Sequence, residues 1–251
     1  MPNIIWRSSK IFIDESWCVV KDKGEVLLIG GLFIPPGDPL ESELEDARNS
    51  IGCIDTLHSS HLSGKKQMYL AEAFQKAFMN SSAKFRVVIL PKLKEEFQKY
   101  CKNERWRMVV KGIKIMLLNS YISNTDKVKL IRPKLIIEKS DEYDKNLYRI
   151  ISELISSLSV NEIFYDEQIN RIKPQPIVSL VDKKVFESLQ LTDLLLSLVK
   201  WDIVSPENDK KRMWEGAKAI LKIKEPKKAS NFSTKDKYNV FSFRGSEAII
   251  N

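Results

Sequence analysis

The stretch Lys10-Ile-Phe-Ile-Asp-Glu-Ser16 decides the fold that we expect, because a strand-forming run ends there on acidic residues. Its β-branched and aromatic residues predict a buried strand that carries Asp14 and Glu15 to the edge of a sheet. Placing carboxylates at the end of a buried strand costs desolvation free energy unless a cation or hydrogen bonds compensate. The pair therefore indicates a site, although the same dipeptide could simply mark a strand end that faces water.

Two further strands are expected directly after the first, over residues 17–21 and 25–34. Between them, Asp22-Lys23-Gly24 is polar and ends on a glycine that can adopt positive φ, which is typical of a hairpin. Pro35-Pro36-Gly37 ends the third strand. The chain is therefore expected to begin with three consecutive antiparallel strands.

Strands and helices alternate along the rest of the chain, which indicates parallel pairing. Helical periodicity is expected over residues 39–51, 65–79, 92–122 with a break near Asn103, 146–158 and 189–201. The strands expected between these helices cover residues 84–90, 134–138, 162–165 and 176–181. These patterns predict an α/β domain with a mixed sheet, in which three antiparallel strands precede parallel strands and helices flank the sheet.

Length and composition set the broad class of the protein. A chain of 251 residues with 43% hydrophobic content can bury a sizeable core, so we expect one domain over residues 1–204. Residues 205–251 form a basic extension that packs on this domain or trails from it. The net charge of +8 and the pI near 9.2 favour a nucleic-acid partner, although a lysine-rich solubilising surface would have the same charge.

Cysteine usage and apolar runs indicate the compartment. Cys18, Cys53 and Cys101 are far apart, which excludes a disulfide framework and a Cys-x-x-Cys zinc site, and indicates reduced thiols in the cytoplasm. No run approaches the ~18 apolar residues of a membrane span, and no secretory leader is recognisable. We therefore expect neither export nor membrane insertion.

A second polar group lies in an almost wholly apolar segment, Glu187-Ser-Leu-Gln-Leu-Thr-Asp-Leu-Leu-Leu-Ser-Leu-Val199. Gln190, Asp193 and Ser197 are spaced i, i+3 and i+7, so they share one stripe of a helix. A carboxylate in such a helix must be paired or bound to a metal. Asp193 is therefore either a metal ligand or the acceptor of an internal hydrogen bond from the backbone or from an arginine.

The segments Ile13-Asp-Glu-Ser16 and Leu189-Gln-Leu-Thr-Asp-Leu-Leu195 together resemble the two signature motifs, Asp-Glu and Gln-x-x-Asp, of the domain-of-unknown-function family 3800, DUF3800. The resemblance spans roughly residues 10–200, and the order and context of two short motifs make it specific. It implies a ribonuclease-H-like fold. It also implies a link to mobile elements or antiviral defence, because some family members look like components of mobile-element or defence loci.

The same resemblance implies that Asp14 is the first-strand metal ligand and Asp193 the last-helix ligand, with Glu15 and Gln190 at the other motif positions. Phosphodiester hydrolysis needs an activated water and charge relief on the leaving oxygen. Two Mg²⁺ or Mn²⁺ ions ~3.5–4 Å apart can supply both through shared carboxylates. For the third carboxylate we choose Glu138, which ends a buried strand that could lie parallel to the first. The alternative is Asp166.

His58 and His61 are the only two histidines, and their spacing can place both on one face of a helix or turn. A zinc site would need further ligands, so they either lie on a surface loop or help to position substrate or shuttle a proton. Lys65 and Lys66 are expected to contact substrate phosphates. Residues 105–107, Arg-Trp-Arg, could contact phosphates and stack bases, or belong with these lysines to a solvated face.

The leading hypothesis is a metal-dependent nuclease of RNA or DNA, acting in bacterial antiviral defence or a mobile element, with a protein partner that supplies target recognition. The alternative is a catalytically inactive ribonuclease-H-like scaffold that binds protein or nucleic acid, because fold alone does not determine function. The chain contains neither a Walker P-loop nor a Gly-x-Ser-x-Gly motif, which argues against nucleotide hydrolysis at a Walker site and against serine-hydrolase chemistry. The sequence allows a homodimer without requiring one.

Overall fold

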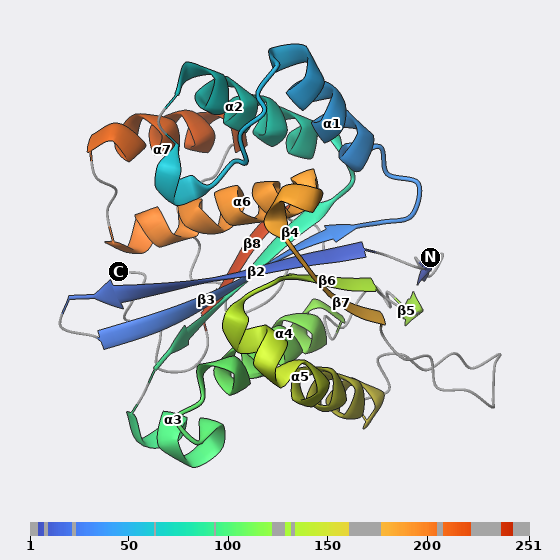
Figure 1. Ribbon diagram of the computed structural model, residues 1–251, viewed down its shortest axis with the longest axis vertical. Coiled ribbons are helices and arrows are strands. Elements are labelled where there is room, and N and C mark those ends of the chain that lie inside the picture. The colour runs from blue at the N-terminus through green and yellow to red at the C-terminus, as the bar shows by residue number, and fades with distance from the viewer. Residues whose placement is uncertain are drawn as a thin grey trace.

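A mixed sheet runs through the centre of the molecule and carries helices on both faces (Figure 1). The computed structural model describes residues 5–7, 10–21, 24–62, 64–92, 94–121, 129–131, 134–160, 177–204, 208–221 and 237–242. In this part of the chain the central sheet has the strand order β7-β6-β2-β3-β4-β8. Its strands are β2 (Lys10–Val20), β3 (Gly24–Ile34), β4 (Lys84–Pro91), β6 (Lys134–Glu138), β7 (Ile177–Val181) and β8 (Tyr238–Ser242). A separate parallel pair joins β1 (Ile5–Arg7) to β5 (Lys129–Ile131).

Strand directions confirm the expected fold class. β3 pairs antiparallel with β2 and with β4, whereas β6 pairs parallel with β2 and β7 pairs parallel with β6. Taking β2, β3, β4, β6 and β7 as strands one to five, their spatial order is 3-2-1-4-5, with only the second strand reversed. This is the ribonuclease-H-like arrangement. β8 extends it by pairing parallel with β4.

The first hairpin differs from the expectation in one respect. β2 is a single strand that pairs with β3 from Lys10 opposite Ile34 to Val20 opposite Gly24. The predicted division of this stretch into two strands is wrong, and the third antiparallel strand is β4. The polar run at residues 14–16 interrupts the hydrophobic pattern, but it leaves the backbone hydrogen-bond ladder intact. Gly24 has φ +83°, as the predicted turn requires.

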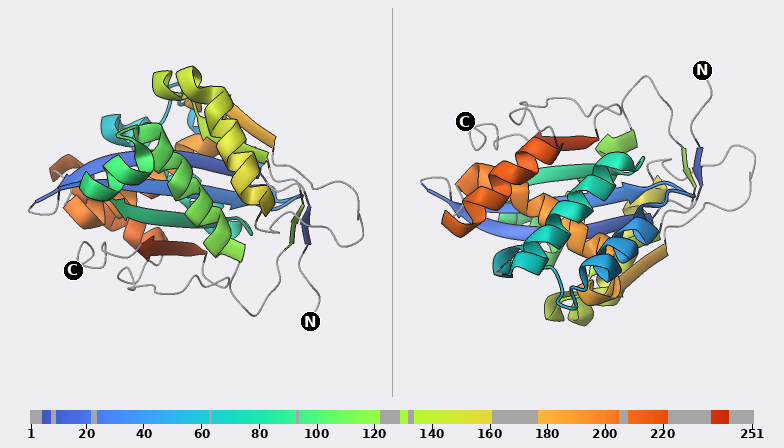
Figure 2. Two further views of the ribbon diagram at one scale, coloured as in Figure 1. Left: turned by 90° about the horizontal axis from the view of Figure 1, so that it is seen from below. Right: turned by 90° about the horizontal axis from the view of Figure 1, so that it is seen from above.

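The helices form separate layers on the two faces of the sheet (Figure 2). One face carries α1 (Leu40–Ile51), α2 (Lys65–Asn80), α6 (Glu187–Val204) and α7 (Asn208–Leu221). The other face carries α3 (Lys94–Cys101), α4 (Arg105–Tyr121) and α5 (Asp141–Val160). Lys102 and Asn103 adopt positive φ between α3 and α4, which confirms the predicted helix break.

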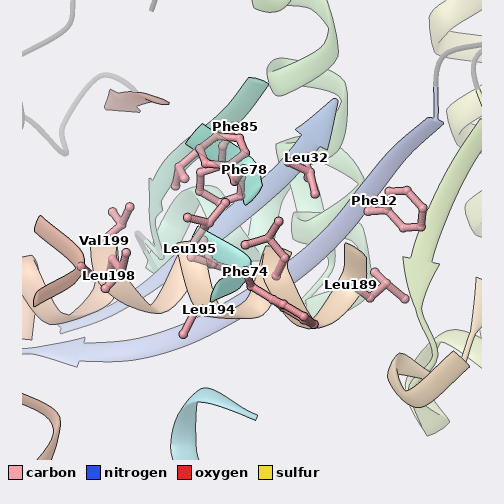
Figure 3. Close-up of a cluster of buried hydrophobic side chains, with 14 of the residues drawn as sticks. Phe12, Leu32, Phe74, Phe78, Phe85, Leu189, Leu194, Leu195, Leu198 and Val199 are labelled. Atoms are coloured by element: carbon pink, nitrogen blue, oxygen red, sulfur yellow. The ribbon is translucent and has the colours of Figure 1, made fainter. Parts of the chain in front are cut away.

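Helix α6 is buried around its whole circumference because it lies between the sheet and a second layer formed by α1, α2 and α7 (Figure 1). Its leucines pack with Phe12 of β2 and Phe85 of β4, as the cluster in Figure 3 shows. Since successive side chains of a strand point to opposite faces, Ile11 and Ile13 instead pack against α4 and α5. This alternation decides which acidic side chains face α6.

Some expected features lie outside the described residues or remain untested. The strand expected at residues 162–165 and the alternative carboxylate Asp166 lie outside them. Within residues 205–251, α7 contacts α2 and β8 joins the edge of the sheet, while the proposed domain division at residue 204 stays a prediction. Of the helices that the structure describes, none is long and apolar enough to cross a membrane.

Candidate functional site

Two neighbouring parallel strands bring the first two acidic residues together. Ile13 of β2 lies opposite Ile137 of β6, so Asp14 and Glu138 are the next residues along both strands. Asp14 is two residues after Phe12 and Glu138 is two residues after Ile136. Because side chains two positions apart in a strand point to the same face, both lie on the face that α6 covers. The expectation that the strand ending at Glu138 lies parallel and adjacent to the first strand is therefore confirmed.

The carboxylates of Asp14, Glu138 and Asp193 converge on the ammonium group of Lys183. The Lys183 Nζ lies 3.1 Å from Asp14 Oδ2, 2.7 Å from Glu138 Oε2 and 3.6 Å from Asp193 Oδ2. The Lys183 side chain is 7% exposed, and Asp14 and Asp193 are also buried. Residues from β2, β6 and α6 thus meet at one point, while their catalytic and metal-binding roles stay predictions.

Lys183 was not foreseen from the sequence. It begins the short 3-10 turn η2 (Lys183–Val185), which joins the end of β7 to α6. The side chain of Asp182 accepts a hydrogen bond from the Lys184 backbone N–H and so caps this turn. The turn directs Lys183 inward, whereas Lys184 is exposed. A lysine two residues after β7 and shortly before the apolar helix that carries Asp193 was the available signal.

The charges in this cluster do not balance. Burial would lower the pKa of Lys183, but the attraction of Asp14, Asp193 and Glu138 outweighs it and raises that pKa well above its usual value. Burial raises the pKa of Asp14, and the neighbouring Asp193 and Glu138 raise it further, although Lys183 opposes them. One ammonium therefore serves three carboxyl groups, an arrangement that favours the uptake of a proton or a further cation.

Asp193 is also held from the opposite side by the short turn η1 (Ser59–His61). The Ser59 backbone N–H donates to Asp193 Oδ2 at 2.9 Å, and the Ser59 hydroxyl donates to Oδ1 at 3.0 Å. Asp193 was expected to bind a metal or to accept an internal hydrogen bond. It accepts a hydrogen bond from the Ser59 backbone, and its carboxylate also faces the ammonium of Lys183. Ser59 itself was missed, because a serine in a polar loop carries no distinguishing pattern.

The two histidines differ in what the structure describes. His58 is about half exposed, and its Nδ1 lies 3.7 Å from Asp193 Oδ2 and 2.7 Å from the Ser60 hydroxyl. It therefore lies at the open side of the acidic cluster. His61 ends η1, and its side chain lies outside the described residues. Any role of either histidine in substrate binding stays a prediction.

Gln190 takes part in a network that fixes the loop before η1. Its Oε1 accepts hydrogen bonds from the Leu57 backbone N–H at 2.7 Å and from Arg48 Nη2 at 2.5 Å. Arg48 also pairs with Glu187 of α6 and donates from Nη1 to the carbonyls of Cys53 and Asp55. Gln190 is thus an organising residue of the loop. The sequence contained no local signal for Arg48.

Glu15 is directed away from the other three carboxylates. As the neighbour of Asp14 on β2, it points to the opposite face of the sheet, where it hydrogen-bonds Tyr143 of α5. Burial raises the pKa of Glu15 to about 7, although the hydrogen bond from Tyr143 opposes this. Only one residue of the Asp-Glu pair therefore joins the cluster on the α6 face.

The basic residues proposed to contact substrate lie in different environments. Lys65 and Lys66 are exposed in the first turn of α2, and Lys66 Nζ donates to the Gly52 carbonyl at 3.1 Å. Trp106 is only 2% exposed and belongs to the core beneath α4. The expectation that it stacks on bases is wrong, because the amphipathic α4 turns this ring inward while Arg105 and Arg107 pair with glutamates.

The donor chemistry of the cluster fits a hard divalent ion, because carboxylate oxygens are the ligands that Mg²⁺ and Mn²⁺ prefer. In the described part of the chain, however, no group of three or more His, Cys, Asp or Glu side chains is arranged to hold a metal ion. The ammonium of Lys183 occupies the point on which the carboxylates converge. A metal ion could use these ligands only if this ammonium moved.

Comparison with known proteins gives a distant structural likeness. No protein-family model and no curated protein matches the chain, so the resemblance to DUF3800 stays an expectation. Ribonuclease H2 from Pyrococcus horikoshii OT3 is 14% identical with a TM-score of 0.44, over 91% of this chain and 82% of that chain. RNase HII from Archaeoglobus fulgidus, solved with PCNA, is 13% identical with a TM-score of 0.42, over 91% and 84%.

A third solved structure, Bst-RNase HIII in complex with Mn²⁺, is 11% identical with a TM-score of 0.36, over 86% of this chain and 63% of that chain. Such values are too low to assign an activity or a metal to this protein. The ribonuclease-H-like class of the chain follows from the order and direction of its strands.

Proposed function

We propose that the protein is a divalent-metal-dependent nuclease that hydrolyses phosphodiester bonds of RNA or DNA. The observation that carries the proposal is the convergence of Asp14, Glu138 and Asp193 where the parallel pairing of β2 with β6 ends, at the carboxyl end of β6. Open α/β sheets bind their ligands beyond this end of the strands. The excess of acidic over basic groups in the cluster supports the binding of a cation there.

In this proposal Asp14, Glu138 and Asp193 hold Mg²⁺ or Mn²⁺, which when bound supplies an activated water and neutralises charge on the leaving oxygen. Ser59 keeps the Asp193 carboxylate in one orientation through its two hydrogen bonds. His58, half exposed beside Asp193, can exchange a proton between the site and solvent or substrate. The exposed Lys65 and Lys66 and the net charge of +8 favour an anionic substrate.

A second candidate function is that of a catalytically inactive ribonuclease-H-like module that binds nucleic acid or protein. The position of Lys183 favours it, because an ammonium that stays among the carboxylates would make them a structural ion cluster. A role in antiviral defence or in a mobile element, with a protein partner for target recognition, is compatible with either function.

Cleavage assays distinguish the two functions. Purified protein is incubated with Mg²⁺ or Mn²⁺ and labelled RNA, single-stranded DNA, both duplexes and an RNA–DNA hybrid. We expect Asp14→Asn and Asp193→Asn each to lower the cleavage rate at least ~100-fold, because loss of a ligand removes several kcal/mol of charge stabilisation. Asp46→Asn, at an exposed position of α1, is the matched control. Absence of cleavage on all substrates, or equal rates for all variants, would reject the nuclease.

A further inference from the structure

One positive charge lies among three acidic side chains in the candidate site. The ammonium of Lys183 is within 3.6 Å of an oxygen of Asp14, Glu138 and Asp193. If all three are ionised, two negative charges remain without compensation. His58 can add a positive charge near Asp193 only in its protonated form. A purely structural ion cluster in a protein interior is stable when its charges are paired, and one ammonium cannot pair three ionised carboxylates.

We propose that Lys183 is an internal counter-ion that holds the acidic site together in the metal-free protein and is displaced when a divalent ion binds. The inference rests on the proposed function, since it names the residue with which the metal competes. It assigns Lys183 two positions: among the carboxylates without metal, and at the rim of the site with metal.

The location of Lys183 allows this movement. It lies in the short turn η2, and its neighbours Lys184 and Val185 are exposed, so the turn is at the surface of the molecule. The Glu138 side chain, which lies 2.7 Å from the ammonium, is 26% exposed and marks the side of the cluster that is open to water. A lysine side chain has a flexible four-carbon stem, so its ammonium can leave the cluster without a change in the backbone.

The displaced ammonium has a defined use. At the rim it becomes a point charge beside the place where a substrate phosphate approaches the carboxylates, a contact that lysine commonly makes. Lys183 would then couple metal binding to substrate binding, because the same event that fills the site presents a cation to the substrate. Without metal, the ammonium would occupy the site and leave the substrate without this contact.

Competition between Lys183 and the metal has a measurable consequence. Methionine resembles lysine in length but has no charge, so Lys183→Met vacates the cation position. We expect Lys183→Met to bind Mn²⁺ at least ~10-fold more tightly than the wild type, because the metal no longer has to displace an ion pair. Binding of Mn²⁺ alone is followed by electron paramagnetic resonance of the free ion or by calorimetry. Asp14→Asn, which removes a carboxylate, should weaken binding.

A second measurement uses the wild type and does not depend on the folding of the variant. The protein is treated with an amine-acetylating reagent with and without Mn²⁺, and acetylation of each lysine is determined by mass spectrometry. We expect Lys183 to be protected without Mn²⁺ and to react when Mn²⁺ is bound. Lys184, the exposed neighbour, should react equally in both conditions and serves as the internal reference.

The outcomes separate this inference from the proposed function. Tighter binding by Lys183→Met together with exposure of Lys183 by Mn²⁺ supports it. If Mn²⁺ binds the wild type while Lys183 stays protected, or if Lys183→Met binds no more tightly, the inference is overturned and the nuclease proposal stands. If neither the wild type nor Lys183→Met binds Mn²⁺, the metal-dependent function fails as well.

Discussion

Replacing Arg48 with methionine is expected to destabilise the protein by about 3 kcal/mol and to loosen the loop that positions Asp193. Arg48 joins α1 to α6 and to this loop through one guanidinium group. Its Nη2 donates to Glu187 Oε2 at 2.7 Å and to Gln190 Oε1, and its Nη1 donates to the Cys53 carbonyl at 2.8 Å and the Asp55 carbonyl at 2.7 Å. Lysine could not reproduce this fork of donors.

The magnitude follows from the burial of these groups. Breaking a buried ion pair by removing one partner costs about 3–5 kcal/mol, whereas exposed pairs contribute about 0–1 kcal/mol. The side chains of Arg48 and Glu187 are each 16% exposed, so some water can reach the abandoned carboxylate. We therefore expect the lower end of the buried range. Methionine keeps part of the apolar stem of Arg48, which limits the loss from packing, although the guanidinium over the Phe74 ring is lost.

Urea unfolding followed by circular dichroism measures the effect. At an m-value of about 2–3 kcal/mol/M, a loss of about 3 kcal/mol lowers the midpoint by roughly 1–1.5 M. Glu187→Gln and the double variant complete a thermodynamic cycle. Because the single variants each leave a polar group without its partner and the double variant leaves fewer, we expect a coupling energy of about 1.5–3 kcal/mol.

Two results would refute this reasoning. A loss of less than about 1 kcal/mol in Arg48→Met would show that water or other side chains replace the guanidinium at low cost. Additive effects of Arg48→Met and Glu187→Gln would show that the two residues do not act as a buried pair. In either case the loop before η1 would be held by its other contacts, such as the hydrogen bonds between Ser59 and Asp193.

Two further predictions concern the acidic residues. The pKa of Glu15 is raised from 4.5 to about 7 in the folded protein, so folding favours its protonated form, and the wild type should lose stability as the pH rises from 4.5 through 7. Glu15→Gln should remove this loss, so its free energy of unfolding relative to the wild type should be up to about 3 kcal/mol more favourable at pH 8 than at pH 4.5. Urea unfolding with a chelator present measures this difference. Equal effects of the substitution at both pH values would contradict the burial of a carboxylate at this position. Glu138→Gln should weaken Mn²⁺ binding and lower cleavage ~100-fold while Asp166→Asn leaves both unchanged, and the reverse result would make Asp166 the third carboxylate.

Local sequence patterns were sufficient for most elements of the fold. Short apolar runs predicted the strands that became β3, β4 and β6, and the helix break near Asn103 followed from the loss of apolar periodicity. The pairing of β6 with β2 followed from the alternation of strands and helices. The continuity of β2 was missed. Backbone hydrogen bonds between strands do not depend on the side chains, so the strand continues through the polar residues 14–16, where the hydrophobic pattern indicated a strand end.

Of the candidate site, the sequence predicted the acidic residues but not the basic residues that pair with them. Carboxylates that directly follow a run of buried apolar residues or lie within an apolar helix conflict with their surroundings, and this conflict is visible in the sequence at Asp14 and Asp193. Lys183 and Arg48 show no such conflict, because each lies in a polar segment where a charged side chain is ordinary. Trp106 was misread for a related reason, since two flanking arginines suggested a surface that helix packing turns inward.

The amino-acid sequence by itself determined where the chain forms strands and helices and which carboxylates must find compensation, because both depend on neighbours along the chain. The tertiary structure alone decided what compensates them. Lys183 meets Asp14 across 169 positions and Arg48 meets Glu187 across 139, and such pairs form only when the sheet and α6 bring distant segments into contact. Residues so far apart in the chain form no periodic pattern, so the sequence does not indicate which cation pairs with which carboxylate.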